Sequence, residues 1–559
     1  MKKILIIIIF FSLSTTVFAQ LSNRHWIPPL HARQANLVED HYLYLSTPVA
    51  SPIQVVVKSG NGIPISGSPF TISQGNPITI GLGYSQPSIM FSDANEVNTP
   101  VTDKGLILES TKDFYASFRV RSQNHAEILV SKGKTALGTS FRIGSVPQEY
   151  DSGIRNFVTS FMATEDNTTV SVSDYESDVV FITPSGDNSY ASQTFNLNKG
   201  QSIVLAGNTS YPSNLTGFVG ALIISDKPIV VNTGNATGGA GPSPGGGNSG
   251  QDFNLDQIVP VEKVGKEYII VKGNGSSNSE FPLIIATENN TEIFVNGNTL
   301  PEIIMQAGDF YKVPNSFYQG TTSQNIYVRS SKPIYMYQVL AGSTSDATSG
   351  LNFIPPLSCF FQKSVDLIPD VDNIGGVQYQ SDVFILTTVG SSVTINGNIT
   401  TVVPENVLGN PNWITYRISN MQGNVVVTST GPLAVGVFGY SGAAGFSGYY
   451  SGFGSEPEDS ETVVCTNNVT NLFDRIPGNP ELGGTWTVPN GAPLLNGDFF
   501  DPSTNIEGLY TYSFSILCEG ELLSTSISID VSLEEGPNAG VNSSVSYCTT
   551  DVIVDLTSL

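Results

Sequence analysis

The sequence predicts an all-β protein built from tandem antiparallel β modules and followed by an immunoglobulin-like β-sandwich. Val, Ile, Thr, Tyr and Phe dominate the ordered-looking stretches, a composition that favours strands. No long stretch combines helical periodicity with capping residues. Three short sequence phrases also recur in the same order along the chain. We expect the modules to be sandwich-like, with a propeller-like closed arrangement as the alternative.

The first recurring phrase reads TENNTEIFV at 287–295 and TEDNTTVSV at 164–172. Two relatives, TTVGSSVTI and TPVASPIQV, occupy 387–395 and 47–55. Each phrase begins with Thr, has a hydroxyl residue fifth and β-branched residues seventh and ninth. The seventh and ninth residues share one face of a strand, and the polar residues before them are typical of a turn. The phrase therefore predicts a hairpin of strand, turn and strand, used four times.

The second phrase reads FTISQGNPI, FNLNKGQSI and IIMQAGDFY, with two apolar residues two apart and then a glycine. These glycines, Gly75, Gly200 and Gly308, predict a tight turn between a strand and its return strand. The fourth copy, around VVPENVLGN, matches poorly.

The third phrase closes each copy and begins at Ser110, Ser225, Ser330 or Ser429. Three copies have Pro at its fourth position, where a residue without an N–H group is expected at the start of a strand or on an edge. The phrases keep their order while the loops between them vary in length. This behaviour is typical of diverged repeats, and it predicts four modules within residues 20–455.

A different pattern follows, with one immunoglobulin-like domain expected at 456–535. The pattern restarts at 536–559, which predicts a second immunoglobulin-like repeat that is truncated. We expect a disulfide between Cys465 and Cys518, because disulfides persist in secreted proteins. Cys359 is expected to be a buried, unreactive residue.

Residues 1–19 predict a secretory signal peptide, with Lys2 and Lys3 followed by a short apolar core and a small-residue cleavage site. Nothing later in the sequence approaches the length of a transmembrane helix, so no transmembrane segment is expected. The net charge of −24 disfavours nucleic acid, because phosphate binding needs clustered Lys and Arg.

The sequence offers no convincing catalytic, cofactor-binding or metal-binding residues, and we expect neither an enzyme nor a cofactor. Ser243 in GPSPG matches a nucleophile motif only literally, because Pro and Gly surround it and no strand or helix is expected beside it. The four histidines lack metal-ligand spacing. Asp366, Asp370 and Asp372 form the densest acidic group but no calcium loop.

Residues 25–455 resemble the N-terminal domain of the IgG Fc-binding protein family, through ATEDNTTVSV, LNKGQSIVL, GFVGALIISDKPIVVNTG and DQIVPVEKVGKEYIIV. This resemblance implies an extracellular, non-enzymatic binding domain but assigns no ligand-binding residues. The Cys-containing unit that follows is similar to immunoglobulin-like repeats of surface proteins exported by the type IX secretion system, which often end in a gliding-motility-type sorting domain.

We therefore expect a secreted or cell-surface protein, associated with the outer membrane, for adhesion or recognition. Its expected partner is an extracellular protein or glycan, such as a glycoprotein or polysaccharide. A structural surface-layer or stalk protein is the alternative, and a glycan-active enzyme is a further one, which would need two carboxylates in a cleft.

Overall fold

The computed structural model describes residues 20–32, 38–149, 153, 155–239, 251–275, 279–341, 350–518 and 521–535. The predicted signal peptide and the predicted second repeat, with Cys548, lie outside them. The all-β prediction is confirmed, because the described helices are all 3-10 helices of three or four residues. These are η2 (Gly133–Ala136), η3 (Pro212–Leu215), η4 (Val261–Lys263), η5 (Asn315–Phe317) and η6 (Phe473–Arg475).

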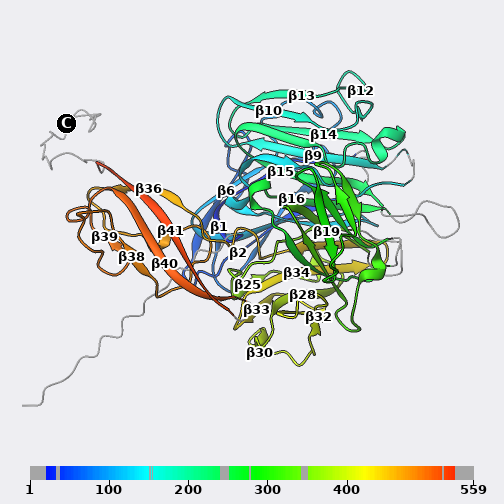
Figure 1. Ribbon diagram of the computed structural model, residues 1–559. Coiled ribbons are helices and arrows are strands. Elements are labelled where there is room, and N and C mark those ends of the chain that lie inside the picture. The colour runs from blue at the N-terminus through cyan, green and yellow to red at the C-terminus, as the bar shows by residue number, and fades with distance from the viewer. Residues whose placement is uncertain are drawn as a thin grey trace, which may run out of the picture. The chain divides into compact units, whose positions relative to one another are not determined.

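The described strands up to residue 449 form four modules, which run from blue through cyan and green to yellow in Figure 1. Module 1 contains β1 (Ser22–Ile27), β2 (Asp40–Ser46), β3 (Ile53–Ser59), β4 (Phe70–Ile72), β5 (Ile78–Tyr84), β6 (Leu106–Arg121) and β7 (Ala126–Val130). Module 2 contains β8 (Gly138–Arg142), β9 (Asn156–Ala163), β10 (Thr168–Ser173), β11 (Val180–Phe181), β12 (Asn188–Ser189), β13 (Gln193–Leu197), β14 (Ser202–Asn208), β15 (Leu222–Gly238) and β16 (Asp252–Ile258).

Module 3 contains β17 (Glu267–Val271), β18 (Phe281–Ala286), β19 (Thr291–Val295), β20 (Ile303–Met305), β21 (Phe310–Lys312), β22 (Asn325–Ser330), β23 (Ile334–Leu340) and β24 (Gly350–Phe353). Module 4 contains β25 (Ser364–Ile368), β26 (Asn373–Ile374), β27 (Val377–Gln378), β28 (Gln380–Thr388), β29 (Val393–Ile395), β30 (Asn398–Ile399), β31 (Glu405–Asn406), β32 (Trp413–Met421), β33 (Val425–Ser429), β34 (Leu433–Ser441) and β35 (Ala444–Tyr449).

All four modules share one strand order. Module 3 shows it most simply, with eight strands at positions a to h in chain order, β17 to β24. Positions a, f, c and d form one antiparallel sheet in that order, and positions h, g, b and e form the other. In modules 1 and 2 a single long strand, β6 or β15, serves as f in one sheet and as g in the other. Apolar residues from both sheets fill the space between them, so each module is a sandwich.

The hairpin prediction for the first phrase is wrong in one respect. The phrase does form strand, turn and strand, but its two strands, at positions b and c, belong to opposite sheets and do not pair. The second phrase likewise carries the chain from position d in one sheet to position e in the other. Its glycines are needed, because Gly75, Gly200 and Gly308 all have positive φ, at 75°, 79° and 86°.

The first Thr of the first phrase has a clear structural role. The hydroxyls of Thr47, Thr164 and Thr287 donate to the carbonyls of Asp113, Pro228 and Pro333, which occupy the fourth position of the third phrase. In module 4 the Thr387 hydroxyl instead pairs with that of Ser429. The bond therefore joins two places where the chain crosses between the sheets, and it explains why the two phrases recur together.

The modules close into a ring. Apolar cores run from module 1 into module 2, from module 2 through module 3 into module 4, and from module 4 back to module 1. At this last junction the buried Arg119 guanidinium donates to the carbonyls of Asp370 and Asn373 at 2.7 and 3.0 Å and lies 3.8 Å from the Tyr44 ring centre. Module 1 is thereby joined to module 4 although they are farthest apart in the chain.

The chain divides into two compact units. The first contains the ring, with Pro477–Pro480 and Ile516–Leu523 added to it. The second contains most of two small sheets. One has the order β36-β41-β40-β38 and the other pairs β37 with β39. Their strands are β36 (Ser460–Cys465), β37 (Thr470–Asn471), β38 (Thr485–Thr487), β39 (Phe499–Phe500), β40 (Gly508–Cys518) and β41 (Glu521–Glu534).

The predicted Cys465–Cys518 disulfide is wrong. Cys518 pairs with Cys359, with a Cα–Cα distance of 5.5 Å, and Cys465 is exposed and unpaired. Cys465 lies opposite Glu534 at one end of β41, whereas the end of β40 that carries Cys518 lies beside the other end, where Ser515 contacts Ser524. Cys465 and Cys518 therefore lie beside opposite ends of the 14-residue strand β41, which is too far apart for a disulfide.

Disulfide mapping tests this pairing. We expect proteolysis without reduction to release a cross-linked peptide containing Cys359 and Cys518, while an alkylating reagent labels Cys465. Cys359→Ser should lower the free energy of unfolding by roughly 5 kcal/mol in the chain-entropy model, because 159 residues separate the cysteines. A peptide that links Cys465 to Cys518 would contradict the structure.

The close approach of modules 1 and 2 gives a second prediction. A Cβ added at Gly200 would collide with the Gly60 carbonyl, whereas one added at Gly75, in the equivalent turn of module 1, would meet nothing within 4 Å. Both glycines have similar positive φ. Gly75→Ala should therefore lower the free energy of unfolding by about 1 kcal/mol through backbone strain, and Gly200→Ala by about 3 kcal/mol or more through the added clash.

Denaturant unfolding of the two variants measures the difference. Equal losses for Gly200→Ala and Gly75→Ala would show that the modules do not meet at this point.

Candidate functional site

The strands at position h meet where the four modules come together. β7 lies against β16 and β35, and β24 also lies against β16 and β35. These inner strands carry three carboxylates that are at most 1% exposed, Glu127, Asp252 and Asp256. These buried titratable side chains lie where the modules come together, so this cluster is the first candidate for a site.

Glu127 contacts the backbone of all four modules. Its Oε1 accepts the N–H groups of Ile128 and Ser447 at 3.1 and 2.9 Å. Its Oε2 accepts those of Leu255 and Leu351 at 3.2 and 3.3 Å. Burial raises the pKa of this carboxyl well above its usual range, and the N–H donors, which favour the carboxylate, oppose that shift.

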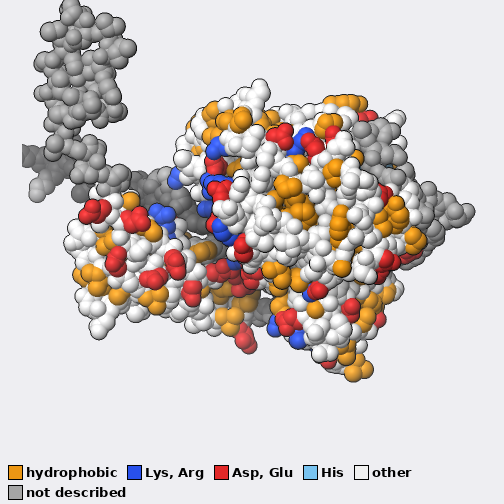
Figure 2. Space-filling view, turned by 90° about the horizontal axis from the view of Figure 1, so that it is seen from above, with side chains coloured by type: hydrophobic (Ala, Val, Ile, Leu, Met, Phe, Trp, Pro, Cys, Tyr) orange, Lys and Arg blue, Asp and Glu red, His pale blue; other side chains and the backbone are white. Residues whose placement is uncertain are grey.

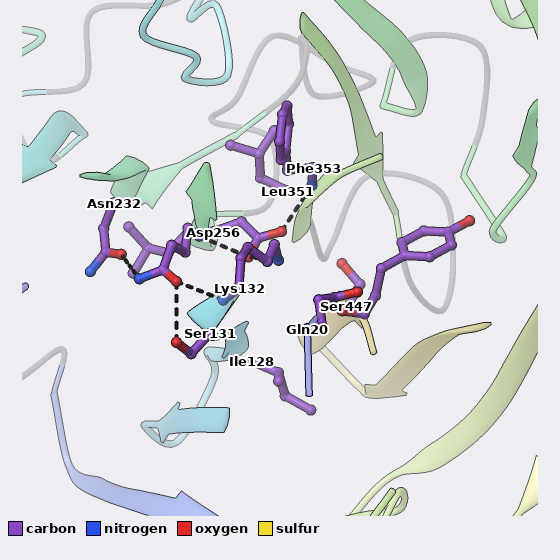
Figure 3. Close-up of polar contacts among 12 residues, drawn as sticks. Gln20, Ile128, Ser131, Lys132, Asn232, Asp256, Leu351, Phe353 and Ser447 are labelled. Carbon is purple, nitrogen blue, oxygen red and sulfur yellow. Dashed lines mark hydrogen bonds and ion pairs between the residues drawn. The ribbon is translucent and has the colours of Figure 1, made fainter. Parts of the chain in front are cut away.

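Asp256 joins three segments of the chain, as Figure 3 shows. Its Oδ1 lies 2.8 Å from the Nζ of Lys132, and its Oδ2 accepts the N–H of Phe353 at 3.0 Å. Both charged side chains are fully buried. Burial lowers the pKa of Lys132 and raises the pKa of Asp256, while their mutual attraction opposes both shifts. The neighbouring Gln257 amide oxygen accepts the Lys132 N–H at 2.7 Å.

Asp252 makes the third connection. Its Oδ1 accepts the Ala126 N–H and its Oδ2 accepts the Gly445 N–H, both at 2.8 Å, so it ties module 2 to modules 1 and 4. Burial raises its pKa to about 7. His125 lies 3.6 Å away, and although burial lowers the pKa of this imidazole, the contact with Asp252 outweighs burial and raises it.

The carboxylate oxygens of this cluster are all occupied by contacts within the protein. Each of its carboxylate oxygens already accepts an N–H group or contacts Lys132, and the cluster is closed to solvent. A catalytic carboxylate or metal ligand needs a free oxygen that faces the ligand. The geometry therefore assigns these groups to holding the modules together.

The weaker candidates from the sequence do not converge. Of the histidines, His25 and His31 are buried and hydrogen-bonded within the core, and burial lowers the pKa of His25 to about 4. Asp366 accepts from the Gln74 amide and Asp372 from the Gly423 N–H. Within the part of the chain that the structure describes, no three His, Cys, Asp or Glu side chains could hold a metal ion. Ser243 lies outside the described residues.

Sequence reasoning missed the buried cluster, although a signal was present. Asp252 and Asp256 stand four residues apart in DFNLDQI, and Glu127 stands inside AEILV. Carboxylates at strand positions with apolar neighbours indicate either an exposed face or a buried partner, and all the residues of β7 and β16 are buried.

Replacement of Glu127 should destabilise the ring. In Glu127→Gln an NH₂ group takes the place of one oxygen and faces two backbone N–H donors, whichever way the amide is turned. We expect a loss of roughly 2–5 kcal/mol in the free energy of unfolding, measured by denaturant titration. Glu292→Gln, at the half-buried position of the otherwise buried strand β19, makes the same chemical change as a control and should change stability by less than about 0.5 kcal/mol. Equal stability of the two variants would contradict this role for Glu127.

The sequence and the structure were compared with those of known proteins. No curated protein matches the sequence. Among solved structures, the crystal structure of the N-terminal eight Ig domains of Down Syndrome Cell Adhesion Molecule, isoform 1.30.30, is 10% identical and aligns over 91% of this chain and 70% of that one. Its TM-score of 0.11 is too low to support an argument.

The family model described as IgGFc binding protein matches residues 125–439. The match begins beside β7 and includes modules 2 and 3 and most of module 4. It covers more than half of the 559 residues. The chain therefore belongs to the IgGFc binding protein family.

Proposed function

We propose that this chain is a secreted or cell-surface recognition protein that binds a glycoprotein, a polysaccharide or another extracellular ligand. The observation that carries the proposal is membership of a family whose description names binding to an immunoglobulin region. We take from the family the binding role rather than the immunoglobulin ligand, which is one of the candidates to be tested.

The division of side chains between interior and surface supports this role. The buried charges of the ring are used to join modules, so they stiffen the scaffold. The first phrase, by contrast, presents exposed turn residues in each module, such as Glu165 to Asn167 and Glu288 to Asn290. Variable loops on a rigid scaffold are a common way to build a binding surface.

The surface also indicates which ligands to expect. Figure 2 shows a face that is mostly uncharged, with acidic side chains spread across it and a group of basic side chains that lies beside acidic ones. The net charge of −24 opposes binding to nucleic acid and to other polyanions. Neutral glycans and proteins with basic or uncharged surfaces remain the best candidates.

We also propose that residues 1–19 direct secretion and that the chain is displayed at the outer membrane through the type IX secretion machinery. The second unit would then be an immunoglobulin-like stalk for the ring. These points rest on the sequence pattern and on the resemblance stated above. Among the described residues, no helix is long and apolar enough to cross a membrane.

A ligand screen with the purified chain tests the recognition role. We expect saturable binding to one class on an array of neutral glycans, acidic glycans, glycoproteins and immunoglobulin Fc, with Kd values in the micromolar range or tighter, which is about −8 kcal/mol. A folded chain that binds nothing would support a structural surface-layer or stalk role instead, and release of sugar from any glycan would support an enzyme.

A further inference from the structure

An open pocket of about 310 Å³ lies in module 4, between the start of β28 and the end of β32. Seven residues line it, and none of them is charged: Gln378, Tyr379, Gln380, Ser381, Asn420, Met421 and Gln422. The four carboxamide residues among them are exposed, whereas Tyr379 and Ser381 are buried. The two buried residues form the floor of the pocket, and the exposed carboxamide residues form its sides.

A β-bulge shapes one wall of the pocket. The pairing of β28 with β32 shifts between Ser381, which lies opposite Met421, and Val383, which lies opposite Ile418. Within the bulge Asn420 has a φ of +59°, a left-handed conformation that is uncommon for residues other than glycine. Bulges often redirect a side chain at a binding site. Here the Asn420 amide oxygen accepts from the Gln380 amide at 3.0 Å, across the two strands.

Buried groups hold this wall in place from behind. The Asn420 N–H donates to Oδ1 of Asp382 at 3.2 Å. The Asp382 side chain is only 2% exposed, and its Oδ2 accepts from Nε of Arg417 at 2.7 Å. On the floor, the Ser381 hydroxyl donates to the Val371 carbonyl at 2.7 Å. The pocket is therefore organised before any ligand arrives, which lowers the entropic cost of binding.

The lining chemistry suits one class of ligand. Each carboxamide offers both a donor and an acceptor, as does each hydroxyl of a sugar, and a carboxamide carries no charge to select an ion. The net charge of −24 further disfavours sialylated or sulfated ligands. We propose that this pocket binds a neutral saccharide unit, with Gln380 and Asn420 as its principal hydrogen-bonding residues. The proposal rests on the recognition function proposed above and gives that function a site.

Asn420→Gly provides a selective test, because glycine keeps the left-handed backbone while the carboxamide is lost. Asn396→Gly is the matched control, since Asn396 is exposed, has a φ of +50° and lies in the turn between β29 and β30, outside the pocket. Gln380→Ala is the second pocket variant. Thermal unfolding of all three should confirm that they fold like the unmodified chain.

The readout is affinity for neutral oligosaccharides, with sialylated and sulfated ones and a panel of glycoproteins and immunoglobulin Fc in parallel. We expect the unmodified chain and Asn396→Gly to bind a neutral oligosaccharide equally, and Asn420→Gly and Gln380→Ala each to bind it roughly ten-fold more weakly.

The other outcomes separate this proposal from the function on which it rests. Neutral-glycan or protein binding that both pocket variants retain in full would overturn the pocket assignment while leaving the recognition role intact. Binding restricted to acidic glycans would overturn the neutral ligand. No binding to any probe by the folded chain would overturn the site and the recognition role together.

Discussion

The ring depends on the hydrogen bonds of the Glu127 carboxylate. Four inner strands, one from each module, meet without forming a common sheet. The N–H groups on the free edge of each of these strands are buried, and an unpaired buried N–H costs free energy comparable to a lost hydrogen bond. One carboxylate accepts from all four strands, because Ile128, Leu255, Leu351 and Ser447 each donate to it. Asp252 and Asp256 extend the same solution along the junction.

This solution explains how diverged modules can keep one architecture. Each sandwich is held together by the apolar residues between its two sheets and by the hydroxyl that joins two crossings between them, so loop lengths are free to change. The contacts between modules are less tolerant. Gly200 and Gly220 lie against the backbone of the neighbouring module with no room for a Cβ, and Arg119 reaches carbonyls of module 4 from within module 1. Variation is therefore expected in the loops and not at these junctions.

The same division bears on function. Charged side chains inside the ring serve the structure, and the pocket in module 4 is lined by uncharged ones. Burying an ion pair such as Lys132 with Asp256 costs desolvation free energy, which is offset only when further hydrogen bonds complete the pair. Asp256 meets this condition, because its two oxygens also accept the N–H groups of Gln257 and Phe353. Recognition can then act through exposed carboxamides without disturbing the charges that hold the modules.

Local patterns in the sequence determined the strands, the four-module repeat and the turn glycines, because alternation and positive φ leave marks in a few neighbouring residues. They could not separate a hairpin from a crossing between sheets, since both read as strand, turn and strand. The partner of Cys518, the meeting of Glu127 with three other modules and the bulge that aims Asn420 join residues distant in the chain or differently paired. The tertiary structure decided these, because register and packing, not composition, set which groups meet.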